Sequence, residues 1–237
     1  MNQEKRRVLV LGGTGAVGRA VIGELSSSEI SFTYCNSEAR AKELSVAYGA
    51  RFMQLDLRDA GALPKWAAQL EADKTLPDVV IHCATVVRQA RIDVATDEDW
   101  DATMSVNARS AFQVCREFGG RMAKSGGGDI VFVSALDRTQ SLPIPSVFAA
   151  SQGLVSALAM SAAKDLGPRN VRVNVVALGL LDSGIGANLD KKLVEDYTAM
   201  SALRRLGHAA EVAKTITWLA LNNSYLNGKV VGVNGGI

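Results

Sequence analysis

Short apolar segments alternate with longer amphipathic segments along this chain. Seven segments of four to seven residues are rich in apolar and β-branched residues, which predicts buried β-strands. These predicted strands cover residues 8–11, 30–35, 51–55, 78–82, 130–134, 171–177 and 229–233. The segments between them have the pattern of α-helices. The predicted helices cover residues 16–25, 39–48, 60–71, 97–118, 148–166 and 212–221.

The alternation of strand and helix predicts a doubly wound α/β fold, in which helices cover both faces of a seven-stranded parallel sheet. The 237 residues suffice for one large domain, and no Pro- or Ser-rich linker divides them. We therefore expect residues 1–237 to form a single domain. Ligands of such sheets bind beyond the carboxyl ends of the strands. The residues predicted at those ends are Gly12, Asn36, Asp56, Ala84, Ser134 and Gly179.

A glycine-rich turn joins the first predicted strand to the first predicted helix. Glycine permits a tight turn and a close approach of the backbone to a pyrophosphate, and the N–H groups of the helix N-terminus face that anion. The spacing Gly12-x-x-Gly15-x-x-Gly18 departs from the common Gly-x-Gly-x-x-Gly, and a glycine turn without a nucleotide is the alternative. If a dinucleotide binds, the residues expected to contact it here are Gly12, Thr14, Gly15, Ala16, Val17 and Gly18.

The end of the second predicted strand favours NADP over NAD. An NAD site usually has a carboxylate at this place, but here Cys35 is followed by Asn36 and Ser37. Arg40 and Lys42 come shortly afterwards, and cations suit the 2′-phosphate of NADP. The alternative is that both cations lie on a solvated helix face.

Two further strand ends carry candidate cofactor contacts. Asp56 and Leu57 follow the third strand, where the carboxylate accepts a hydrogen bond from an adenine amino group or else caps the next helix. Ala84 follows the fourth strand and is also expected to contact the cofactor. Asn107 lies inside the long helix 97–118, where a poor helix former calls for an explanation.

Charge and cysteine usage narrow the class of protein. The chain has 26 basic and 24 acidic residues, a net charge of +2, which offers no case for nucleic acid or a membrane surface as partner. Apolar runs are short of a membrane span, and the N-terminus leads straight into the first strand, so no signal peptide is expected. Three widely spaced cysteines suit reduced thiols and a cytoplasmic location. His82-Cys83 is interpreted as a pair of buried strand-end residues, and no metal site is expected.

The order of these segments resembles the short-chain dehydrogenase/reductase family over essentially the whole chain, and most of all the 3-oxoacyl-carrier-protein reductases. The resemblance implies a Rossmann fold and hydride transfer between NADP and a carbonyl. The segments that carry it are the turn 12–18, Asp56-Leu57, Val106-Asn107, 174–179, 205–213 and 227–236.

Three of the four catalytic residues that the resemblance implies are replaced. The family uses Asn, Ser, Tyr and Lys, and only Asn107 is retained, as the residue that supports a proton-relay water. Ala135 stands in the place of the serine, Phe148 of the tyrosine and Gln152 of the lysine, with the spacing intact. Phenylalanine has no proton to give, and a positioned general acid is worth about 10²–10⁴-fold in rate. Carbonyl reduction of the usual kind should therefore be nearly abolished.

The implied cofactor site departs from the family pattern as well. Residues 82–85 read His-Cys-Ala-Thr in place of Asn-Asn-Ala-Gly, so that Thr85 puts a side chain where backbone usually approaches the cofactor. Ala16 replaces a glycine, and Leu178 replaces a proline beside the nicotinamide. NADP remains the expected cofactor, although these changes weaken its site.

The leading hypothesis is a non-catalytic homologue that serves as a partner or scaffold subunit in carrier-protein-linked fatty acid or polyketide-type metabolism. It would form a homotetramer, or a hetero-oligomer with an active relative, through the helix holding Asn107 and the helix starting at Phe148. Arg169 and Arg172 are candidate contacts for an acidic acyl carrier protein, with a solvated turn as the alternative.

Two other functions stay open: an NADP-dependent oxidoreductase or altered chemistry in the same pocket, and a nucleotide-binding regulator without turnover. Apolar residues in the expected substrate loop 181–203 suggest an apolar ligand or interface, namely Ala187, Leu189, Leu193 and Met200. Altered chemistry would draw on the polar candidates Asn107, Ser134, Asp137, Arg138, Gln152, Asp182 and Ser183.

Overall fold

A computed structural model describes residues 5–135 and 144–237. Its centre is one parallel sheet of seven strands in the order β3-β2-β1-β4-β5-β6-β7, as the alternating pattern predicts. The order reverses direction between β1 and β4, so the sheet opens a crevice there at its carboxyl edge. The strands are β1 (Arg7–Leu11), β2 (Glu29–Tyr34), β3 (Arg51–Gln54), β4 (Val79–His82), β5 (Gly128–Ser134), β6 (Val171–Leu178) and β7 (Val230–Val233).

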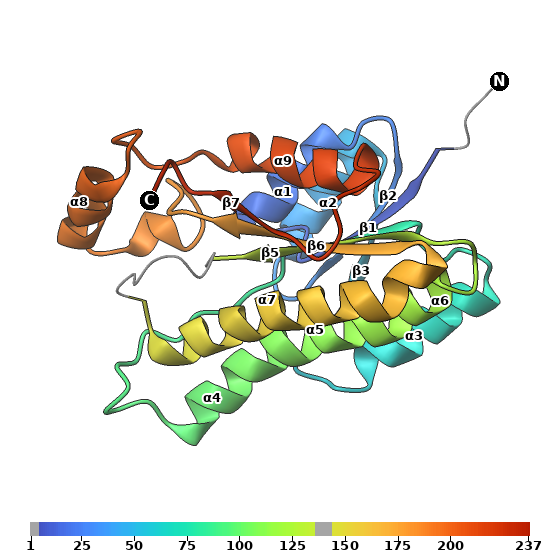
Figure 1. Ribbon diagram of the computed structural model, residues 1–237, viewed down its shortest axis with the longest axis horizontal. Helices are drawn as coiled ribbons and strands as arrows, with labels where there is room; N and C mark the ends of the chain where they lie inside the picture. Colours follow the sequence, from blue (N-terminus) through green and yellow to red (C-terminus); the bar gives the residue numbers. More distant parts are fainter. Residues whose placement is uncertain (1–4, 136–143) are drawn as a thin grey trace.

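Helices cover both faces of the sheet, and each face has its own apolar core (Figure 1). One face is covered by α1 (Ala16–Glu24), α2 (Glu38–Tyr48) and α9 (Ala209–Leu221). The other face is covered by α3 (Ala62–Ala72), the long helix that starts with α4 (Asp97–Met104), and α7 (Ser146–Leu166). The predicted doubly wound fold is confirmed.

The long helix begins as predicted but contains two π-helical turns. Thr96 and Asp99 form a capping box at its start. Its first π turn contains Asn107, so the poor helix former lies where the backbone bulges, as occurs at many functional sites. The helix ends later than predicted, and its segments are α4, η1 (Ser105–Arg109), α5 (Ser110–Gln113), η2 (Val114–Gly119) and α6 (Gly120–Met122).

Helix α7 is apolar because it is packed on two sides. By length and composition alone, Ser146–Arg169 could span a membrane, contrary to the expectation that no apolar run does so. Half of that stretch is buried inside the protein, where Val155, Ala159 and Leu166 join the core beneath β5 and β6. Its composition is therefore accounted for by packing against the sheet and the long helix.

The expected substrate loop 181–203 contains secondary structure that the sequence analysis missed. It includes the short helices η4 (Gly186–Asn188) and α8 (Lys191–Met200). Helix α8 lies at the left of the molecule in Figure 1. Asp190 caps α8 by accepting hydrogen bonds from the N–H groups of Lys192 and Leu193. The last short helix, η3 (Gly167–Arg169), links α7 to β6.

Two glycines of the first turn bring the site together. Gly12 has a φ of +78°, and a Cβ added there would lie 2.7 Å from the backbone of Ala84, so the ends of β1 and β4 touch. A Cβ on Gly18 would lie only 2.3 Å from the carbonyl oxygen of Gly12. Glycine at both positions is thus a steric requirement of the turn.

Candidate functional site

A deep cleft of about 760 Å³ runs along the carboxyl edge of the sheet. The ends of β1, β2, β3 and β4 line one half of it, and the ends of β5 and β6 with α8 line the other. Most of the predicted cofactor residues converge there although they come from separate segments. The ones that line the cleft are Gly12, Thr14, Gly15, Ala16, Val17, Asn36, Ser37, Arg40, Asp56, Leu57 and Ala84.

Gly18 does not belong to that lining. Its Cα packs against the carbonyl of Gly12 beneath the turn, so it shapes the turn without facing the cleft. Gly15 is the N-cap residue of helix α1 and supplies no side-chain cap, and no acidic residue lies in the first turn of the helix. The N-terminal N–H groups are therefore available to an anion in the cleft.

Asp56 is paired with an arginine that the sequence analysis overlooked. Both carboxylate oxygens accept from the Arg58 side chain, at 2.6 Å for Nη2 and 3.0–3.1 Å for Nε, and Oδ1 also accepts from the Arg58 N–H. This hydrogen bonding holds the pKa of Asp56 below its usual value. Asp56 does not cap the next helix, because α3 begins only at Ala62, and an adenine amino group would have to share the carboxylate with Arg58.

The cations near the end of β2 are divided between the cleft and the surface. Arg40 is exposed and lines the cleft. Lys42 does not, and its ammonium lies 2.9 Å from Glu38 one helical turn away, so the solvated-face alternative holds for Lys42. Arg58 takes its place as the second cation of this end of the cleft.

At the other end of the cleft, the residues that replace the expected catalytic set form a closed hydrogen-bond network. The side-chain oxygen of Gln152 accepts from the N–H of Ala135 at 3.1 Å, and its Nε2 donates to Ser151 Oγ at 3.3 Å. Ser151 in turn donates to the carbonyl of Phe148 at 2.7 Å. Gln152 and Phe148 are buried and line the cleft, so Gln152 ties the end of β5 to α7.

Asn107 completes this network from behind the cleft wall. Its Oδ1 accepts from the Val86 N–H at 2.8 Å and from Thr85 Oγ at 3.3 Å. Its Nδ2 donates to the Val86 carbonyl at 2.9 Å and to Ser151 Oγ at 3.0 Å. An amide offers two donors and two acceptor lone pairs, so the hydrogen-bonding capacity of Asn107 is filled. The Asn107 side chain therefore fixes the loop after β4 and has no free side-chain group for the expected relay water.

His82 is a buried strand-end residue, as the sequence analysis expected, whereas Cys83 is half-buried and lines the cleft. His82 is 3% exposed, and its Nε2 lies 2.7 Å from Ser110 Oγ. Burial lowers the pKa of His82 to about 4 and raises that of Cys83 to about 12, so both are neutral at pH 7. Over residues 5–135 and 144–237, no group of three or more His, Cys, Asp or Glu side chains could hold a metal ion.

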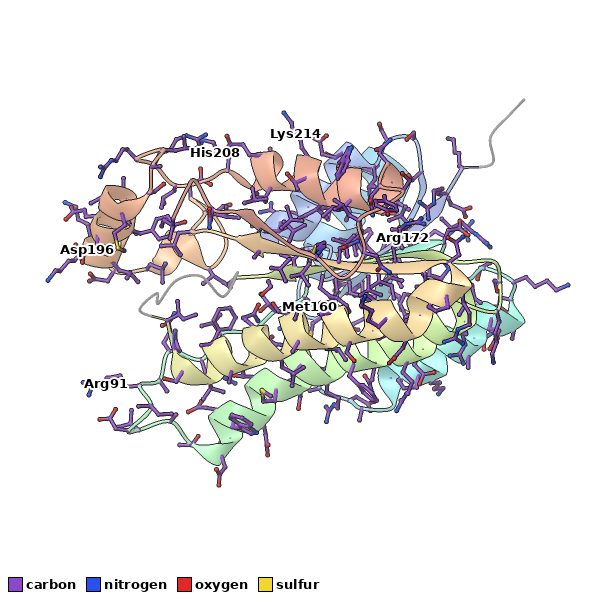
Figure 2. All side chains as sticks on the ribbon, viewed as in Figure 1. Arg91, Met160, Arg172, Asp196, His208 and Lys214 are labelled. Atoms are coloured by element: carbon purple, nitrogen blue, oxygen red, sulfur yellow. The ribbon has the colours of Figure 1, made fainter. Side chains whose placement is uncertain are left out.

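The remaining polar candidates are only partly brought together. Ser134, Gln152 and Ser183 line the cleft, and the Ser183 hydroxyl is buried without a partner among the described residues. Asp182 turns away, since its carboxylate lies 2.5 Å from Nδ1 of His208 at the start of α9 (labelled in Figure 2). Asp137 and Arg138 lie outside the described residues.

The comparisons with known proteins agree with this geometry. Residues 20–237 match the family described as enoyl-(acyl carrier protein) reductase. The chain belongs to the short-chain dehydrogenase/reductase family.

Individual relatives place it near the 3-oxoacyl-[acyl-carrier-protein] reductases. FabG of Thermotoga maritima is 35% identical over 161 residues, which cover 68% of this chain and 65% of that protein. MabA of Mycobacterium tuberculosis is 26% identical over 98% of this chain and 92% of its own. A solved short-chain dehydrogenase/reductase of Serratia marcescens superposes with a TM-score of 0.88 at 25% identity, covering 99% and 98% of the two chains.

The half of the cleft lined by the ends of β5 and β6 and by α8 is largely apolar. Leu189, Leu193 and Met200 line it as expected, whereas Ala187 does not. The sequence analysis missed most of this wall because its residues come from loops and from α8. They are Val86, Val87, Arg88, Ile144, Leu180, Ile185, Asp196 and Tyr197.

Arg172 is unsuited to the docking role suggested for it. Its guanidinium makes two hydrogen bonds, of 2.7 and 2.9 Å, to the buried carboxylate of Asp129. It lies six residues before the cleft end of β6, about 20 Å away at 3.3 Å per residue. Figure 2 shows it at the opposite end of the molecule from Asp196. Arg169 is exposed, and its nearest hydrogen bond is to the Asp165 carbonyl at 3.3 Å.

Proposed function

We propose that this short-chain dehydrogenase/reductase binds NADP(H) but does not carry out the family's usual carbonyl reduction, and that it acts as a partner subunit in carrier-protein-linked metabolism. The observation that carries the proposal is the wall formed by Ala135, Phe148 and Gln152. The phenyl ring of Phe148 lies where the proton donor is expected, and the side-chain oxygen of Gln152 accepts a hydrogen bond from the Ala135 N–H.

The polar groups around Phe148 support this proposal because they are already hydrogen-bonded to other parts of the protein. Ser151 accepts from Asn107 and Gln152 and donates to the Phe148 carbonyl. A substrate carbonyl beside Phe148 would meet a hydrocarbon ring, and the charge that tunes a catalytic phenol is missing from Gln152. Loss of the general acid alone costs about 10²–10⁴-fold in rate.

Nucleotide binding is proposed because the opposite half of the cleft keeps its shape. The glycine turn, the uncapped start of α1 and the cations Arg40 and Arg58 line that half. A helix N-terminus suits the pyrophosphate, and arginine suits a 2′-phosphate, so NADP(H) is favoured over NAD(H).

The proposed assembly surface is the outer side of the long helix and α7. A groove of about 710 Å³ runs between them, and Phe112 and Leu154 are 45% and 38% exposed beside it. We propose that a second copy, or an active relative, covers this groove and so forms one of the interfaces of a tetramer in the cytoplasm. Arg169 remains the candidate contact for an acyl carrier protein.

The first experiment tests binding and turnover separately. Calorimetry with NADPH should give a micromolar dissociation constant for the unaltered protein, while NADPH oxidation with a 3-oxoacyl thioester stays at background. The triple variant Ala135→Ser/Phe148→Tyr/Gln152→Lys should gain ketoreductase activity, and the double variant that retains Phe148 is the matched control. Substantial reduction by the unaltered protein would refute the non-catalytic proposal, and absence of NADPH binding would refute the cofactor proposal.

The assembly proposal has its own test. Phe112→Arg should lower the sedimentation coefficient, because it breaks the assembly at this interface. The matched control is Trp218→Arg, because Trp218 is 49% exposed on α9, on the other face of the sheet. A monomeric unaltered protein that also stays apart from a co-expressed active relative would refute this proposal.

Altered chemistry in the same pocket is the second candidate function. The buried hydroxyl of Ser183 in the cleft favours it, because it has no hydrogen-bond partner within residues 5–135 and 144–237 and a ligand could supply one. Turnover of NADPH with non-carbonyl acceptors, lost in Ser183→Ala, would establish it.

A further inference from the structure

The loop between β3 and α3 forms one wall of the proposed nucleotide site. Four consecutive residues at its start, 55–58, line the cleft, and this segment holds the Asp56–Arg58 ion pair. The loop has no regular secondary structure, so its position depends on what holds its backbone.

Two side chains of the long helix hold that backbone from outside the cleft. Arg109 Nη2 donates to the carbonyl of Arg58 at 2.6 Å, and Gln113 Nε2 donates to the carbonyl of Ala60 at 2.7 Å. The two are four residues apart and so lie on one face of the helix. Elsewhere in the described chain, every recorded hydrogen bond to residues 56–61 joins positions at most four residues apart.

Holding these two side chains in place lowers the stability of the folded protein. Arg109 Nε and Gln113 Oε1 are buried without hydrogen-bond partners among the described residues. Burying an unsatisfied polar atom is unfavourable, and an apolar side chain would fill either position without that penalty. Core packing alone therefore does not account for Arg109 and Gln113, whereas fixing two consecutive turns of the loop does.

We propose that Arg109 and Gln113 are positioning residues for the adenine end of the nucleotide, acting through the backbone of Arg58 and Ala60. This inference rests on the proposed NADP(H) binding. Arg109 also lines the outer groove beside Phe112, so the helix connects the proposed assembly surface with the nucleotide wall. Asn107, two residues before Arg109 on the same helix, holds the backbone of Val86 in the same manner.

The test divides the cofactor into its two halves. Arg109→Met and Gln113→Leu keep the side-chain volume but remove the donors. Each should weaken binding of NADPH and of 2′,5′-ADP by a similar factor, about 3- to 10-fold for one lost hydrogen bond. Binding of reduced nicotinamide mononucleotide should stay within about twofold of the unaltered protein, since its contacts are at the far end of the cleft.

Hydrogen exchange supplies a readout that needs no nucleotide. Backbone amides of residues 57–61 should exchange faster in both variants, and those of residues 84–89 should not change. The matched control is Arg116→Met, because Arg116 lies on the same helix but contacts Glu117 and the ring of Phe112 rather than the loop.

Three outcomes overturn the inference: unchanged 2′,5′-ADP binding, equal losses for both halves of the cofactor, or unchanged exchange at 57–61. Failure of the unaltered protein to bind NADPH or 2′,5′-ADP would refute the proposed cofactor and this inference together. Normal binding by the unaltered protein with no effect of the variants would refute the positioning role alone.

Discussion

Replacing His82 by asparagine should remove much of this protein's sensitivity to mild acid. His82 ends β4, is 3% exposed, and packs with its ring centroid 5.8 Å from that of Phe132. Its Nε2 lies 2.7 Å from the Ser110 hydroxyl, which itself donates to the Val106 carbonyl. The ring therefore has a partner in its neutral form, and a second proton would put a charge into the core.

The magnitude follows from the pKa difference between folded and unfolded chains. Burial lowers the pKa of His82 from 6.5 to about 4 in the folded protein. Between those values the unfolded chain binds the proton and the folded one does not, so stability falls as pH falls. The contribution is complete above pH 6.5 and lost by pH 4. Each pKa unit is worth about 1.4 kcal/mol, which gives about 3 kcal/mol in all and about 2 kcal/mol between pH 7 and pH 4.5.

The assay is urea unfolding of the unaltered protein and of His82→Asn at pH 7.0 and pH 4.5, at one protein concentration. Carboxylates titrate in both proteins, so their effect cancels when the two pH differences are subtracted. The matched control is His208→Asn, because His208 is the other histidine of the chain and lies exposed at the start of α9.

The unaltered protein should lose about 2 kcal/mol more than His82→Asn on going from pH 7.0 to pH 4.5. The same loss in both proteins would show that His82 is protonated in the folded state at pH 4.5. The burial argument would then be wrong, and with it the assignment of His82 as a neutral core residue.

Two further substitutions test the glycine turn after β1 and the buried ion pairs of Asp129 on β5. Gly18→Ala puts a methyl group 2.3 Å from the Gly12 carbonyl, so NADPH affinity measured by calorimetry should fall more than about tenfold, whereas Gly120→Ala, in open space on a helix, should leave it unchanged. Asp129→Asn leaves two arginines facing a buried neutral amide and should lower the free energy of unfolding in urea by about 3 kcal/mol. Asp78→Asn, in a half-exposed ion pair, should lower it by about 1 kcal/mol or less. Equal effects within either pair of variants would contradict the steric or electrostatic argument.

The fold could be predicted from the sequence because its signals are local. Strand and helix periods alternate along the chain, and right-handed crossovers leave few ways to arrange them. The replacement of the implied catalytic residues was also visible, because the resemblance to the short-chain dehydrogenase/reductase family assigns those roles to the positions of Ala135, Phe148 and Gln152. Boundaries were less certain, and α8 was missed because it lies in an irregular loop.

Contacts of the candidate site were predicted less well because they join distant segments. Asp56 was expected to face an adenine or to cap the next helix, and it lines the cleft with its carboxylate bound by Arg58. Lys42 was expected either near a phosphate or on a solvated helix face, and it pairs with Glu38. Arg172 was expected at a docking surface, but it neutralises Asp129 from the neighbouring strand. In each case the residue type was compatible with both roles, and only its nearest partner in space distinguishes them.

The sequence by itself determined the fold, the edge of the sheet where ligands bind, and the absence of the expected proton donor at position 148. The first two follow from periodicity and spacing, which are properties of neighbouring residues, and the third follows from the resemblance to the short-chain dehydrogenase/reductase family. The tertiary structure alone decided that the Asn107 side chain is hydrogen-bonded to capacity, that Gln152 ties β5 to α7, and that Arg109 holds the loop after β3. Hydrogen bonds between residues up to 51 positions apart depend on how helices pack against the sheet, which no local pattern encodes.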